Sequence, residues 1–183
     1  MYFRTITIVL CFVIQGCSFG ASDTQSSRVY SSPKEKFELT LPKGWTIYWA
    51  EEDSSQVEGA RQVLMAFRTT TPGEGFFSIL GVRSEDDELG AALDKLVISM
   101  ERQYSLMGGY FRSSGPKREG KIGDRNASAI PYVSRRTPGE ELSGFAYVVP
   151  ASDRELYFIL GGGTNKQATS EVRKIIISIS FPD

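Results

Sequence analysis

Apolar and polar residues alternate with period two through much of this chain, a pattern typical of strands that bury one face. The alternation is clearest over residues 37–41, Phe-Glu-Leu-Thr-Leu, and Pro42-Lys43-Gly44 interrupts it before a return strand over 45–49. Apolar runs at 63–70 and 76–84 flank a turn that contains Pro72-Gly73, which predicts a hairpin. Further strands are predicted at 110–113, 117–122, 127–135, 142–150 and 155–160.

Two stretches show helical spacing instead. The first begins at Ser84, which forms a capping-box pattern with Asp87, and Gly108-Gly109 ends it. Its apolar stripe is Leu89, Leu93, Leu96, Val97, Met100 and Tyr104. The second is the last helix, for which Thr164 or Asn165 is the expected N-cap. Its apolar face is Ala168, Val172, Ile175, Ile176 and Ile179.

This order of elements predicts an α+β fold with a mainly antiparallel sheet. Residues 156–160 are apolar at every position, so this strand is expected to be covered on both faces by helices. The predicted architecture is therefore an α/β/α sandwich. The predicted core residues are Phe37, Leu39, Leu93, Val97, Tyr147, Phe158, Ile159, Val172 and Ile176.

The N-terminus has the organisation of a bacterial lipoprotein signal. Arg4 gives a positive start, residues 6–14 form an apolar run, and Ile14-Gln15-Gly16-Cys17 resembles a lipobox. We predict a signal peptide over residues 1–16 and a lipid on Cys17. Plain secretion and an uncleaved N-terminal anchor are the alternatives, although the apolar run is shorter than the roughly 20 residues that a membrane span needs.

Residues 18–32 are rich in small and polar residues and predict a flexible tether after Cys17. One domain is then expected over residues 33–183. Ser18 follows the lipidated position where an Asp would mark retention, and in enteric bacteria this favours the outer membrane. Cleavage before Cys17 removes Cys11, so the mature chain would keep one thiol, and that thiol would be lipidated.

The charge balance argues against a nucleic-acid partner. Removal of Arg4 with the signal leaves 20 basic and 22 acidic residues, and no run of basic residues for anionic lipid is evident. Membrane association is therefore expected to come from the acyl chains.

The chain contains no histidine among its 183 residues. This excludes Ser-His-Asp and Cys-His catalysis as well as His-bound zinc, and the mature domain lacks a free thiol. Carboxylate, Lys, Tyr or Ser chemistry remains open. Neither a catalytic set nor a cofactor motif can be assembled from the spacing, so we expect no cofactor and no metal.

The opening Phe37-x-Leu39-x-Leu41-Pro42-x-Gly44-Trp45 resembles the start of the PsbP-like superfamily. The order of elements is also similar, including a hairpin at 123–126 and a closing Ser180-Phe181 pair. The resemblance covers about residues 31–181 and includes DcrB-type bacterial lipoproteins. It implies an α/β/α sandwich and a non-catalytic accessory or binding role, and it offers no catalytic residues to carry over.

Other clusters have simpler structural interpretations. The acidic residues 85–88 suit a helix start better than a calcium loop, and Gly161-Gly162-Gly163 suits a tight turn better than an anion cradle. Asn126-Ala127-Ser128 is read as turn chemistry rather than a glycosylation site. Two alternatives, an exposed aromatic platform and a place in the core, are considered for Trp45, Tyr48 and Trp49. A solvated edge is preferred over a basic patch for Lys117, Arg118, Lys121, Arg135 and Arg136.

The sequence therefore predicts a membrane-anchored envelope lipoprotein that binds a protein partner without catalysis. The alternative is an enzyme that works without histidine, or a small-ligand-binding protein of the cell envelope.

Overall fold

The computed structural model describes residues 26–50, 60–68, 74–83, 88–135, 139–152 and 154–182, without the side chains of Trp49 and Ala50. The predicted signal peptide and Cys17 lie outside these residues. The main sheet is antiparallel, with strand order β3-β4-β5-β10-β9-β8-β6, and β7 also pairs with β8. Its strands are β3 (Trp45–Ala50), β4 (Ala60–Arg68), β5 (Gly75–Arg83), β6 (Tyr110–Ser113), β7 (Arg118–Ile122), β8 (Arg125–Arg135), β9 (Glu141–Ser152) and β10 (Glu155–Gly163).

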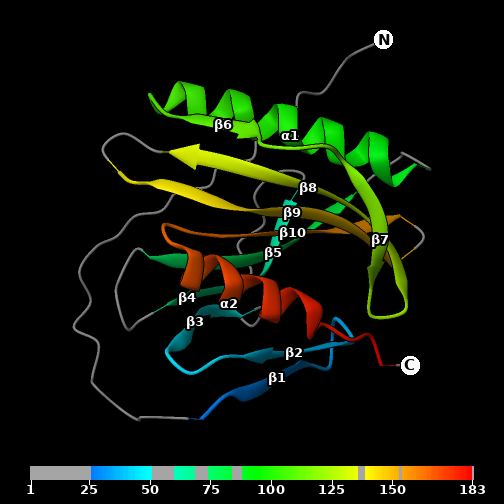
Figure 1. Cartoon of the computed structure of the whole chain (residues 1–183). Coiled ribbons are helices and arrows are strands. Elements are labelled where there is room, and N and C mark those ends of the chain that lie inside the picture. Colours follow the sequence, from blue (N-terminus) through cyan, green and yellow to red (C-terminus); the bar gives the residue numbers. More distant parts are fainter. Residues whose placement is uncertain are drawn as a thin grey trace.

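Three layers result, as Figure 1 shows. Helix α1 (Leu89–Leu106) packs on one face of the sheet, against β6, β8 and β9. Helix α2 (Lys166–Ile177) packs on the other face, chiefly on β10, together with a separate hairpin of β1 (Arg28–Ser32) and β2 (Phe37–Leu41). The predicted α+β fold with helices on both faces is confirmed.

β10 separates two hydrophobic cores. Leu156, Phe158 and Leu160 lie in the core under α1, whereas Tyr157 and Ile159 lie in the core under α2. Alternate side chains of a strand point to opposite faces, so a strand that is apolar throughout serves both layers. Eight of the nine predicted core residues are buried, but Tyr147 is half-buried, because α2 does not fully cover β9.

The predicted boundary between tether and domain, at residues 32 and 33, is wrong. Residues 28–32 form β1, which pairs with β2 from Arg28↔Leu41 to Ser32↔Phe37. The Ser and Arg residues of β1 give it no regular alternation of apolar and polar positions, so the sequence does not predict it as a strand. Its formation depends on pairing with β2. The folded structure therefore begins by Arg28.

Two element ends also differ from expectation. α1 begins at Leu89, with Glu88 as an N-cap that makes no side-chain capping bond, and the predicted capping box at 84–87 lies outside the described residues. Gly161-Gly162-Gly163 does not end β10 but continues it, paired with residues 143–145 of β9 and 75–77 of β5. Among the described helices, neither is long and apolar enough to cross a membrane.

Candidate functional site

Part of the sheet has an uncovered face beside α2. Over 129–133 of β8 and 145–147 of β9, the residues that face α1 are buried, whereas the alternate residues on the α2 side are only half-buried. The half-exposed set, here called the open face, is Ala129, Pro131, Val133, Phe145 and Tyr147. Cross-strand pairs such as Pro131↔Phe145 and Ala129↔Tyr147 hold these side chains in one layer. In Figure 1, α2 lies across β10, and β9 and β8 run beside it without a helix in front.

Two aromatic rings form the centre of the open face. The rings of Phe145 and Tyr147 lie 6.4 Å apart between centroids, at an interplanar angle of 46°. Partial burial raises the pKa of the Tyr147 hydroxyl, and nearby Arg173 of α2 opposes that shift. The Thr169 hydroxyl of α2 lies 2.9 Å from the Asn165 carbonyl and 3.3 Å from the Ser143 carbonyl of β9, so its one proton serves either acceptor.

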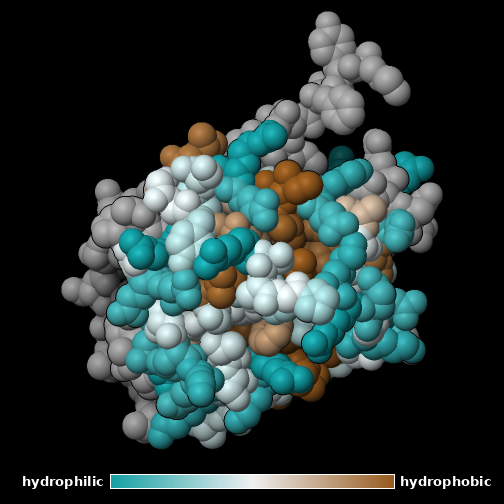
Figure 2. Space-filling view, turned by 45° about the horizontal axis from the view of Figure 1, so that its top comes forward, coloured by the Kyte–Doolittle hydropathy of each residue, from teal (hydrophilic) through white to brown (hydrophobic). Residues whose placement is uncertain are grey.

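Arginines from four elements surround the aromatic pair. Arg112 is the cross-strand partner of Val133, and Arg118 is the partner of Ala129, so both lie on the same side of the sheet as the open face. Arg135 lies two residues beyond Val133, and Arg173 of α2 is near enough to Tyr147 to oppose the rise in the pKa of its hydroxyl. We call Arg112, Arg118, Arg135 and Arg173 the arginine rim; all four are exposed. Figure 2 shows brown and pale side chains in the middle of the molecular surface, bordered by teal ones.

The basic set predicted from the sequence is therefore divided. Arg118 and Arg135 share the open face, but Lys121 lies on the other side of β7, and Arg136 lies outside the described residues. Lys117 makes an ion pair with Asp94 of α1 at 2.7 Å, which raises the pKa of the lysine. Neighbouring positions along a strand point to opposite faces, so proximity in sequence is a poor guide to a shared surface.

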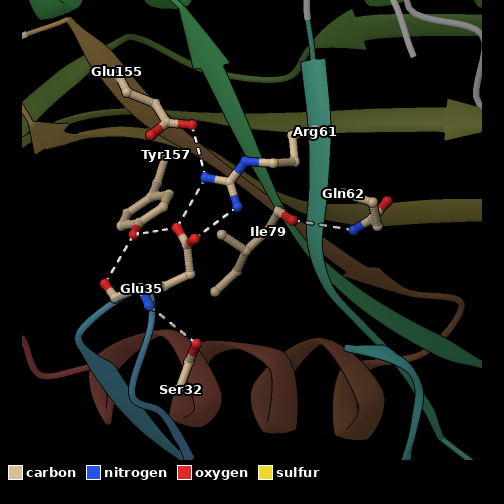
Figure 3. Close-up of polar contacts among 7 residues, drawn as sticks. All are labelled: Ser32, Glu35, Arg61, Gln62, Ile79, Glu155 and Tyr157. Carbon is tan, nitrogen blue, oxygen red and sulfur yellow. Dashed lines mark hydrogen bonds and ion pairs between the residues drawn. The ribbon is translucent and has the colours of Figure 1, made fainter. Parts of the chain in front are cut away.

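A second polar cluster fastens the β1–β2 hairpin to the sheet (Figure 3). Glu35, in the hairpin turn, has a side chain that is 7% exposed and accepts two hydrogen bonds from Arg61 of β4, at 2.7 and 3.0 Å. Arg61 also donates to Glu155 at 2.8 Å. The Tyr157 hydroxyl lies 2.8 Å from Glu35 Oε2 and 2.9 Å from the Glu35 carbonyl, so its one proton serves either acceptor.

This cluster is a closed network. Hydrogen bonding to Glu35 raises the pKa of Arg61, and burial, followed by the bond to Glu35, raises the pKa of Tyr157. Both carboxylate oxygens of Glu35 are engaged, and a general base needs a free lone pair directed at a substrate. The arrangement therefore serves to hold the hairpin. Sequence reasoning missed it, because the partners are 26 and 122 residues apart.

The aromatic residues of β3 are divided between core and surface. Trp45 is buried, as the core alternative expected for at least one tryptophan, and its indole donates to Glu171 of α2 at 2.8 Å, while Tyr48 is 56% exposed and packs edge-on against Phe67. A register shift lies between Ile47 and Trp49 in the pairing of β3 with β4. The side chain of Trp49 lies outside the described residues.

The remaining candidates have structural roles. Asn165 caps α2 by accepting from the Ala168 amide at 2.9 Å, as predicted, and the preceding glycines are strand residues and form neither turn nor anion cradle. Asn126 is exposed on β8, where it follows the two-residue turn Gly123-Asp124 and Arg125. The hydroxyl of Ser128 donates to Glu119 at 2.8 Å. Residues 85–87 lie outside the described residues. Within those described, no group of three metal-ligating side chains gathers.

A shallow hollow of about 330 Å³ lies away from the open face, lined by the Gly123-Asp124 turn and the chain end at Ser180-Phe181-Pro182. Its main interaction is between the Arg125 guanidinium and the Phe181 ring, 4.0 Å from the centroid. This contact ties the C-terminal segment to the β7–β8 hairpin.

Comparison with known proteins places the fold. No protein-family model and no curated protein matches the chain. Among solved structures, the chain is similar to the solution structure of cyanobacterial PsbP (CyanoP) from Synechocystis sp. PCC 6803. The match has a TM-score of 0.61 and 13% identity, and covers 92% of this chain and 99% of that one. The chain therefore has a PsbP-like fold, as the opening motif implied.

Proposed function

We propose that this protein is a lipid-anchored lipoprotein of the cell envelope that acts as a non-catalytic accessory or binding protein, with the open face as its contact surface. The lipid is placed on Cys17. Ser18 makes the periplasmic side of the outer membrane the preferred location in a Gram-negative cell.

One observation carries the binding role: a half-exposed layer of apolar and aromatic side chains on β8 and β9, bordered by exposed arginines. Contiguous apolar surface with a polar border is typical of interaction sites. The PsbP-like fold supports the same class of function by analogy.

The segment between the proposed lipid anchor and the domain is short enough to keep the domain near the membrane. Residues 18–27 separate Cys17 from β1. Fully extended, this segment spans at most about 35–40 Å, which keeps the domain within its own diameter of the membrane. The tether continues into the β1–β2 hairpin, which is bonded to the main sheet through Glu35, Arg61 and Tyr157.

The anchoring part of the proposal is tested by Cys17→Ser, with Cys11→Ser as the matched control. Cys11 lies within the predicted signal peptide and Cys17 directly follows it, and only Cys17 is the proposed lipid acceptor. We expect Cys11→Ser to be processed and retained in the membrane fraction. Cys17→Ser should remain an unprocessed precursor or enter the soluble envelope fraction. A processed Cys17→Ser protein that stays in the membrane would refute lipidation at this residue.

A further inference from the structure

We infer that the open face and the arginine rim bind the anionic phospholipid headgroups of the membrane that carries the anchor, so that the domain lies on the bilayer. This inference rests on the proposed function for the nearness of that membrane, and on the open face for the chemistry.

The charge of the surface matches an anionic ligand. Among the described residues, no ion pair engages the guanidinium groups of the rim; Arg112 lies 5.1 Å from the Tyr110 ring centroid. Glu141, the cross-strand partner of Arg135, accepts a hydrogen bond from the Tyr110 hydroxyl. An arginine guanidinium can donate two parallel hydrogen bonds to two oxygens of one phosphate group, and it is positively charged at every physiological pH.

The side chains of the open face suit the surface of a bilayer. The open face is a layer of side chains on two paired strands, and none of its residues lines the hollow at Gly123 and Phe181. Half-exposed Tyr and Phe side chains beside cations suit the boundary between headgroups and acyl chains. A layer that extends over two strands can contact several headgroups at once, and each arginine near an anionic surface adds a similar increment of affinity.

The attachment point also permits this orientation. The β1–β2 hairpin and α2 share the face of the sheet to which the open face belongs (Figure 1). The tether therefore leaves the domain on the side that carries the aromatic layer. Because the lipid holds the protein at the membrane, even a weak contact would be populated by the high effective concentration of headgroups.

The test uses the full chain with Cys17→Ser, which lacks the lipid, and vesicles of phosphatidylcholine with or without phosphatidylglycerol. The measured quantity is the ratio of the two affinities, compared between this protein and each triple variant of it, since the N-terminal apolar run and Arg4 contribute equally to all of these proteins. We expect preference for the anionic vesicles, weakening with salt. Combined Arg112→Glu, Arg118→Glu and Arg135→Glu should lower affinity for them about a hundredfold.

The matched control reverses three exposed arginines elsewhere: Arg83→Glu, Arg102→Glu and Arg154→Glu. It has the same net charge as the rim variant and should keep the preference. Equal binding to both vesicle types, or equal losses in the two triple variants, would overturn the inference. So would tighter competition by polyglutamate than by anionic vesicles, which would assign the face to an acidic protein segment. Membrane retention of the lipidated wild type tests anchoring separately.

Discussion

At the scale of single residues, Glu35 connects the hairpin to two strands of the main sheet. Its carboxylate faces Arg61 and Tyr157 and is almost completely removed from water. Breaking a buried ion pair leaves an uncompensated charge, which costs more than the pair contributes. The stability of the hairpin should therefore depend strongly on this side chain.

We predict that Glu35→Gln lowers the free energy of unfolding by about 3 kcal/mol, because Arg61 and Tyr157 lose a charged acceptor in a dry site. Urea denaturation provides the measurement. Glu140→Gln, at an exposed carboxylate, serves as the control and should change stability by less than about 0.5 kcal/mol. Equal stability of the two variants would contradict the role assigned to the network.

Local contacts at this scale were predictable and distant ones were not. Thr164 or Asn165 was expected as the N-cap of α2, and the capping bond of Asn165 to Ala168 spans only three residues. The Glu35–Tyr157 bond spans 122 residues and depends on how the hairpin folds onto the sheet. A sequence gives no spacing rule for such a pair.

At the scale of elements, β9 and β10 leave no room for a side chain at Gly144, which pairs with Gly162 and lies beside Gly161. A Cβ atom on Gly144 would lie 2.1 Å from the Gly161 carbonyl oxygen, a backbone atom that cannot rotate away. The glycines are thus needed for strand pairing, which explains why a Gly-rich segment that predicts a turn continues as a strand.

Gly144→Ala should destabilise the protein by about 3 kcal/mol, since the two strands must separate to admit the methyl group. Gly120→Ala is the matched control within the same sheet, because a Cβ there meets nothing within 4 Å. Thermal denaturation of both variants measures the difference. Similar melting temperatures would show that the β9–β10 pairing does not depend on this close approach.

The attachment of α2 should depend on pH. Burial acts to raise the pKa of Glu171, but hydrogen bonds from Trp45, Gln167 and Arg68 outweigh it and leave the pKa below its ordinary value of 4.5. A carboxylate whose pKa is lower in the folded state than in the unfolded state stabilises the folded protein. This contribution is complete at pH values above the unfolded-state pKa and disappears as pH falls through the folded-state pKa.

Glu171→Gln should therefore cost about 1–2 kcal/mol at neutral pH, and the difference from wild type should shrink below about pH 4.5. Denaturant titrations across acidic pH provide the measurement. Glu101→Gln, on the exposed side of α1, should show no comparable pH-dependent difference. A constant Glu171→Gln deficit at all pH values would exclude the charge as its cause.

At the scale of the whole molecule, the sheet is covered unequally. α1 covers β6, β8 and β9 on one side, but α2 and the hairpin leave part of β8 and β9 open on the other. The sequence predicted the two helical layers because the strand at 156–160 is apolar throughout. It did not predict the open face, because a half-exposed Tyr147 has the same period-two pattern as a buried one, and only the position of α2 distinguishes them.

Photo-crosslinking in intact cells tests whether the open face is the contact surface of a membrane-anchored protein. A photoreactive side chain replaces Tyr147, and the control replaces Ile98, which is 57% exposed on α1. We predict abundant covalent adducts from position 147, few from position 98, and loss of the former when the rim arginines are reversed. Equal labelling from both positions, or none from position 147, would contradict it.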